Sequence, residues 1–153
     1  MTVYLVRHAK AGSRKAWTDD DELRPLSKAG KAQARALAKR LAGDGITRVL
    51  SSPYVRCRQT VEPLAEGRGV PVEPSDALRE GASLPDSLRL VEKVAGENAV
   101  LCTHGDVLGN LLLHFAELGV DLQTDRIEKG SVWALELDDG EVRSATYHPP
   151  PGG

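Results

Sequence analysis

The protein has 153 residues, of which 41% are hydrophobic and 27% are charged, and its formal net charge is −2. This length and composition indicate one globular domain with a buried core, and the balanced charge gives no reason to expect nucleic acid or a membrane as a partner. No apolar run approaches the ~20 residues that a membrane-spanning helix needs, and charged residues interrupt the first apolar segment too early for a signal peptide. We therefore expect a single domain over residues 1–148, a flexible tail over 149–153 and a cytoplasmic location.

The N-terminal apolar run, Val3–Val6, predicts a strand that ends in Arg7 and His8. An apolar strand that delivers polar side chains at its end is a common way to build a site in an α/β fold. The pair taken alone fits equally well a buried strand that reaches the surface. Residues 7–15 contain four basic and no acidic side chains, which suits an anionic ligand. The acidic run at 19–22 predicts a solvated face and not a cation site, which needs spaced oxygen ligands.

Two strand–helix units follow and predict a parallel sheet with helical crossovers. Ser27–Ala42 is a helix with Ser27 as its N-cap. Arg48–Ser52 is a strand, and the next helix has Pro53 in its first turn and ends near Glu66.

Arg56 and Arg58 both lie in the first turns of this second helix. A helix N-terminus attracts anions, and an arginine there adds a planar fork that can grip two oxygens. Because residues two apart on a helix point in different directions, we expect only one of the two arginines to enter a site.

The second half of the chain brings another histidine to a strand end. The predicted elements are a strand at 70–74, a loop at 76–81, a helix at 85–95, a buried strand at 98–103, a helix at 107–118 and a hairpin of 131–137 with 142–147. His104 follows the buried strand, and Gly105 after it permits close approach of a ligand. If these strands are parallel, their ends open on one edge of the sheet, where two arginines and two histidines fit a dianionic phosphoryl group.

Cys57 and Cys102 are the only cysteines. Neither has a CxxC partner, and two cysteines do not make a disulfide scaffold. We interpret both as small buried apolar residues, and no cluster of metal ligands is predicted.

Three short motifs match one known family in order and spacing. VRHA near the N-terminus, SSPxxR in the first third and THG in the last third together resemble the motifs of the histidine phosphatase superfamily. The resemblance implies the phosphoglycerate mutase-like fold, an α/β three-layer sandwich in which a mixed, mainly parallel sheet is flanked by helices. It also implies a covalent phosphohistidine intermediate and no metal or other cofactor.

The resemblance assigns roles to single residues of this sequence. His8 carries over as the catalytic nucleophile, Arg7 and Arg56 as phosphate ligands, and His104 as a phosphate ligand and transition-state donor, whereas Arg58 stays outside the site. A nucleophilic imidazole must be unprotonated, and we expect Arg7 and Arg56 to favour that form by lowering the pKa of His8.

Glu80 is the candidate general acid. Family members that cleave ordinary phosphate esters protonate the leaving oxygen with a carboxylic acid, and Glu80 lies in the corresponding part of the chain. The alternative interpretation is a solvated loop carboxylate. A phosphohistidine substrate leaves as imidazole and needs little help from an acid, so the role of Glu80 bears on the identity of the substrate.

The short chain, the RHAKAG opening and the ELRPLSKAG segment resemble the short bacterial branch of phosphohistidine phosphatases. Mutases of the superfamily are longer and cover the site with insertions, so we expect hydrolysis. Arg24 of the second segment is either a further positive charge of the site or a surface arginine, and we favour the surface position. Phosphohistidine on a protein is the favoured substrate. The alternative substrates are small phosphoesters or nucleotides, with Glu80 as the general acid. The alternative outside enzymes is a non-catalytic module that binds phosphate or a phosphoprotein.

Overall fold

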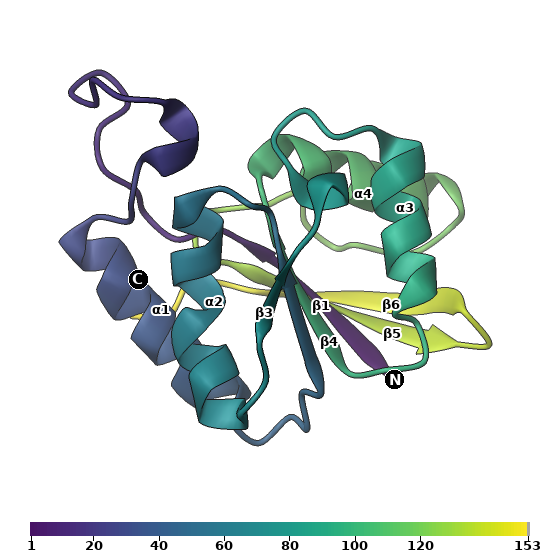
Figure 1. Ribbon diagram of the computed structural model, residues 1–153. Helices are drawn as coiled ribbons and strands as arrows, with labels where there is room; N and C mark the ends of the chain where they lie inside the picture. Colours follow the sequence, from purple (N-terminus) through teal and green to yellow (C-terminus); the bar gives the residue numbers. More distant parts are fainter. Residues whose placement is uncertain (153) are drawn as a thin grey trace.

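A computed structural model describes residues 1–152 of the chain, which form a six-stranded mixed sheet between two layers of helices (Figure 1). The strand order is β3-β2-β4-β1-β5-β6. The strands are β1 (Thr2–Arg7), β2 (Arg48–Ser51), β3 (Val72–Pro74), β4 (Ala99–Thr103), β5 (Val132–Asp138) and β6 (Glu141–His148). The first four are mutually parallel, and β5 and β6 extend the sheet as an antiparallel hairpin. The predicted fold class is therefore confirmed.

Helices α1 and α2 cover one face of the sheet, and α3 and α4 cover the other (Figure 1). The helices are α1 (Lys28–Leu41), α2 (Val55–Arg68), α3 (Leu84–Lys93) and α4 (Gly105–Glu117), and two short 3-10 helices are η1 (Asp21–Leu23) and η2 (Asp76–Leu78). No helix within residues 1–152 is both long enough and apolar enough to cross a membrane.

The helix boundaries follow local capping, with two differences from the sequence-based expectation. The Ser27 hydroxyl accepts a hydrogen bond from the Gly30 amide at 3.1 Å, so the predicted N-cap of α1 is confirmed. Helix α2 starts later than predicted, because Tyr54 has an extended backbone and acts as the N-cap, which leaves Pro53 ahead of the first turn. Helix α4 begins at Gly105, two residues earlier than expected, with His104 as its N-cap.

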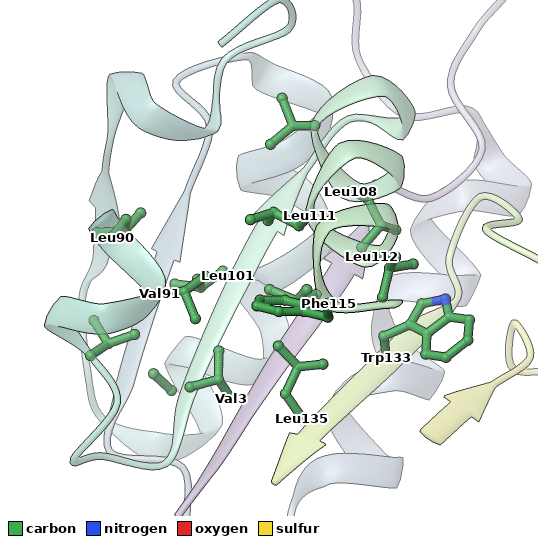
Figure 2. Close-up of a cluster of buried hydrophobic side chains, with 14 of the residues drawn as sticks. Val3, Leu90, Val91, Leu101, Leu108, Leu111, Leu112, Phe115, Trp133 and Leu135 are labelled. Atoms are coloured by element: carbon green, nitrogen blue, oxygen red, sulfur yellow. The ribbon is translucent and has the colours of Figure 1, made fainter. Parts of the chain in front are cut away.

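Both faces of the central strands are buried, as is usual for parallel strands covered by helices on each side. Val3 and Leu5 of β1 pack beneath α3 and α4, while Tyr4 and Val6 pack beneath α1 and α2. Figure 2 shows the first of these clusters, in which Phe115 of α4 lies against the sheet.

Parallel pairing brings the ends of β1, β2 and β4 to one edge of the sheet. Arg7 is paired with Thr103, and Ser51 with Cys102. The residues that follow each strand, among them His8, Ser52 and His104, therefore emerge side by side at this edge.

The C-terminal hairpin is confirmed. Asp139 and Gly140 both have positive φ, 52° and 77°, as a two-residue hairpin turn requires. In the segment after the hairpin, the Pro149 carbonyl accepts a hydrogen bond from Arg40 Nη1 at 2.6 Å, and Pro151 is buried. The last residue of the tail that we expected to be flexible, residue 153, lies outside the described residues.

Candidate active site

His8 is held in one orientation by backbone on both sides. Its amide donates to the Thr103 carbonyl at 3.1 Å, and its ring Nδ1 lies 2.8 Å from the Ala9 carbonyl. Because a carbonyl oxygen only accepts hydrogen bonds, Nδ1 carries the proton in the neutral ring. The lone pair therefore lies on Nε2, which is free for reaction.

The pKa of His8 is lowered to about 3. Burial is the largest cause, since the residue is only 6% exposed. The hydrogen bond to the Ala9 carbonyl opposes the shift, and the charges of Arg56, His104 and Arg7 add to it. The expected effect of the two arginines is thus present, but desolvation exceeds it. At neutral pH the ring is uncharged, as a nucleophile must be.

Arg7 lies beside the first turn of α4. Its Nη1 donates to the Ile127 carbonyl at 2.9 Å, and its Nε is buried with no hydrogen-bond partner in residues 1–152. Gly105 makes this position possible, because a Cβ there would lie 2.9 Å from Arg7 Cζ and 3.1 Å from its Nε. Glycine at position 105 therefore permits the guanidinium to lie against the helix backbone.

Arg56 is completely buried at the start of α2. Its Nη1 donates to the Asp21 carbonyl at 2.9 Å and its Nη2 to the Asp21 carboxylate at 3.0 Å. Its Nε has no partner in the described chain. Arg58, two residues later, is exposed. The two arginines therefore differ in burial, as expected from their spacing, and the role of Arg56 as a phosphate ligand stays a prediction.

The acidic run forms a solvated face only in part, which corrects the prediction: Asp19 and Asp20 are exposed, whereas Asp21 and Glu22 are half-buried. Asp21 lies in η1, where it binds the guanidinium groups of Arg24 and Arg56, and Glu22 is paired with Arg79. The reason is that η1 folds over the start of α2, so that arginines distant in sequence meet these carboxylates.

Arg24 is buried and not on the surface, so that prediction is wrong. Its Nε lies 3.0 Å from Asp21 Oδ1, and its Nη1 donates to the Gly12 carbonyl at 2.6 Å. Arg24 thereby forms hydrogen bonds both to η1 and to the loop that follows β1.

His104 faces His8 across the site, with ring centroids 5.6 Å apart. Its Nε2 lies 2.9 Å from Ser52 Oγ and 3.5 Å from Cys57 Sγ, whereas its buried Nδ1 has no partner in residues 1–152. The Ser52 hydroxyl already accepts a hydrogen bond from the Tyr54 amide, so its own proton is available to Nε2. In that arrangement Nδ1 carries the proton and is a donor.

Cys57 and Cys102 are both free and buried, as predicted. Cys57 contacts His104, so this side of the imidazole is closed to water.

Glu80 and both histidines line one cavity of about 580 Å³. The Glu80 side chain is 40% exposed, and its oxygens lie 3.5 Å from Arg14 and 3.8 Å from Arg56. The structure therefore brings Glu80 to the same site as the other predicted residues.

The cavity has further charged lining residues that sequence reasoning did not identify individually. Arg14 belongs to the basic loop noted above, but Asp106 and Lys129 had no recognisable signal in the sequence. Together, the buried Nε atoms of Arg7 and Arg56 and the Nδ1 of His104 provide donors without acceptors. The charges of all three side chains act on His8, and an anion whose oxygens reached these nitrogens would supply the missing acceptors.

Known proteins with similar sequence or structure agree with this geometry. The family model described as histidine phosphatase superfamily (branch 1) matches residues 3–83. The 8-oxo-(d)GTP phosphatase of Mycolicibacterium smegmatis is 41% identical over 157 residues, which cover 98% of this chain and 48% of that protein. The chain spans about half the length, or less, of the curated relatives it matches.

Solved structures match over nearly the whole chain. The protein histidine phosphatase SixA in complex with tungstate has a TM-score of 0.76 and 26% identity, with 97% of this chain and 95% of that chain covered. The putative phosphohistidine phosphatase SixA from Agrobacterium tumefaciens has a TM-score of 0.71 and 25% identity, with 97% of each chain covered. On the sequence match and this shared fold, the chain belongs to the histidine phosphatase superfamily.

Proposed function

We propose that the chain is a phosphatase that transfers a phosphoryl group from its substrate to His8 and then to water. One observation carries the proposal: a neutral, buried imidazole with Nδ1 fixed on a carbonyl leaves Nε2 free, and the three side chains whose charges act on this ring, Arg7, Arg56 and His104, each have a nitrogen without a partner in residues 1–152. A nucleophile in a cluster of hydrogen-bond donors is the arrangement that phosphoryl transfer requires.

In the first step, the lone pair of His8 Nε2 forms a bond to phosphorus while the bond between phosphorus and the leaving group breaks, a P–O bond in an ester or nucleotide and a P–N bond in a phosphohistidine. Arg7, Arg56 and His104 donate to the phosphoryl oxygens as charge moves onto them. The protonated Glu80 carboxyl gives its proton to an alkoxide leaving group.

In the second step, water attacks the phosphorus of phospho-His8 and the P–N bond breaks. The proton of the attacking water passes to Glu80, and the products are inorganic phosphate and a neutral His8. The hydrogen bond from Nδ1 to the Ala9 carbonyl holds the ring in place through both steps.

Two substrate classes are supported by different observations. The similarity to SixA over 97% of this chain supports phosphohistidine on a protein. The 41% identity to an 8-oxo-(d)GTP phosphatase supports a nucleotide, and so does a cavity of about 580 Å³, a size that encloses small-molecule ligands. A non-catalytic binding module is disfavoured, because phosphate binding alone does not need a free nucleophilic nitrogen.

The covalent mechanism is tested with p-nitrophenyl phosphate and His8→Asn. We expect wild type to form an acid-labile phosphoenzyme and to release p-nitrophenol, and the variant to do neither. Turnover by His8→Asn at the wild-type rate refutes the proposal.

Arg56→Lys and Arg58→Lys provide a matched pair for the role of the buried arginine. Removing a transition-state donor costs about 100- to 1,000-fold in kcat, and we expect a loss of that order for Arg56→Lys. Arg58→Lys is the control, because it is the same substitution on the same helix at an exposed position. We expect it to keep the wild-type rate.

A further inference from the structure

We propose that Arg14 and Lys129 bind a second phosphate group of the substrate, so that the enzyme favours phosphoanhydrides such as nucleoside di- and triphosphates over phosphomonoesters. This inference rests on the proposed phosphatase function and specifies its substrate class. The two residues come from separate segments, Arg14 from the loop after β1 and Lys129 from the segment between α4 and β5, and both line the cavity that contains His8.

The first phosphate group leaves these two cations unused. Arg7, Arg56 and His104 have the unpartnered nitrogens next to His8, and the guanidinium of Arg24 is already bound to Asp21 and to the Gly12 carbonyl. The remaining basic side chains of the lining, Arg14 and Lys129, are therefore available to a second group of the ligand.

Lys129 has no carboxylate partner in the described chain, and the two carboxylate contacts of Arg14 are long. Lys129 forms no ion pair with any other residue of the described chain. Arg14 lies 3.8 Å from Asp21 and 3.5 Å from Glu80, longer than the 2.7–2.9 Å of a strong charge-assisted hydrogen bond. Its side chain is 66% exposed, so it is free to turn toward a ligand.

The mutual repulsion of the cations is visible at Lys129. Burial lowers its pKa first, and the charges of Arg7, Arg24, Arg14 and Arg56 lower it further. A polyanion in the cavity relieves this repulsion, and it does so more fully than a monoester because it carries more negative charge.

The carboxylates of the cavity do not cancel this charge. Four basic side chains line it, against the two acidic ones of Glu80 and Asp106. The Asp106 carboxylate accepts a hydrogen bond from the Gly81 amide at 2.7 Å. Its negative charge also opposes the lowering of the Arg7 pKa that burial causes. Glu80 lies between Arg14 and Arg56. Lys129, an exposed lining residue, is thus left without a carboxylate partner.

This second-phosphate subsite, formed by Arg14 and Lys129, also fits the chemistry of the transfer. When the terminal phosphoryl group of a nucleoside triphosphate moves to His8 Nε2, the bond between that phosphorus and the bridging oxygen breaks. The electron pair stays on the nucleoside diphosphate, which leaves as an anion without needing a proton. Arg14 and Lys129 stabilise the negative charge that develops on this leaving phosphate.

Lys129→Gln and Arg14→Gln test the inference when GTP is compared with p-nitrophenyl phosphate. We expect the ratio of kcat/KM for GTP to kcat/KM for the monoester to fall at least tenfold in each variant. Lys10→Gln is the matched control, because Lys10 is an exposed lysine of the same basic loop that does not line the cavity, and the ratio should stay at the wild-type value.

An unchanged ratio in Lys129→Gln and Arg14→Gln, with monoester turnover that still requires His8, overturns the second subsite and leaves the proposed phosphatase intact. If no substrate shows turnover that depends on His8, the proposed function fails and the subsite fails with it.

Discussion

Protonation of His8 is the perturbation that tests the buried nucleophile most directly. The pKa of this imidazole is about 3 in the folded protein, compared with an ordinary value of 6.5, and burial is the largest cause. Between these two values the unfolded chain binds more protons than the folded one. The stability that neutral His8 contributes is therefore complete above pH 6.5 and is lost as the pH falls toward 3.

The size of this effect follows from the two pKa values. Each unit of pKa difference corresponds to about 1.4 kcal/mol. Between about pH 7.5 and about pH 5.0, linkage gives a loss of about 2 kcal/mol from this one residue. The loss reaches about 4 kcal/mol at about pH 3 and approaches about 5 kcal/mol below it, an appreciable part of the stability of a small domain.

Urea unfolding of wild type and His8→Asn at about pH 7.5 and at about pH 5.0 measures this loss of unfolding free energy, with tryptophan fluorescence as the signal. Asparagine is the appropriate replacement, because its amide nitrogen can donate to the Ala9 carbonyl as Nδ1 of His8 does. Titration of the carboxylates is common to both proteins, so the free energy of unfolding of wild type should fall by about 2 kcal/mol more than that of the variant. An equal fall in both proteins would refute the reasoning that His8 is buried in its neutral form.

Two glycines give predictions from packing. Gly105→Ala places a Cβ 2.9 Å from Arg7 Cζ, so we expect the guanidinium to shift and kcat/KM to fall about 100-fold or more with little change in the urea midpoint; wild-type kinetics would contradict this contact. Gly30→Ala places a Cβ 1.9 Å from the Lys10 carbonyl oxygen, and we expect a loss of about 2–4 kcal/mol in unfolding free energy. Gly43→Ala, with no atom within 4 Å of the added Cβ, is the control, and equal effects in the two alanine variants would show that the packing argument is wrong.

Element type and order were predictable because the hydrophobic pattern records which side of each element is buried. The alternation of Val3 and Leu5 with Tyr4 and Val6 across the two faces of β1 is an example. The start of α2 was predicted less well. Tyr54 is extended and forms the N-cap, and its amide donates to the hydroxyl of Ser52, which also contacts His104. The preference of proline for the first turn of a helix does not include these contacts.

The pairing of charges could not be predicted, because it depends on contacts between segments far apart in the sequence. Asp21 and Arg56 are separated by 35 residues and meet only when η1 folds over α2. A charged residue taken alone is most often exposed. This general expectation was wrong for Arg24, which is buried, and for Asp21 and Glu22, which are half-buried.

The sequence by itself determined which side chains are candidates for the site, since strands that run parallel must bring their following residues, His8 and His104 among them, to one edge of the sheet. Tertiary structure decided what state those side chains are in. The neutral ring of His8 and the unpartnered nitrogen of Arg56 depend on burial and on the distances between charges, quantities that local sequence does not contain. The position of Lys129 in the cavity is likewise a tertiary property, because it depends on the path of the chain between α4 and β5.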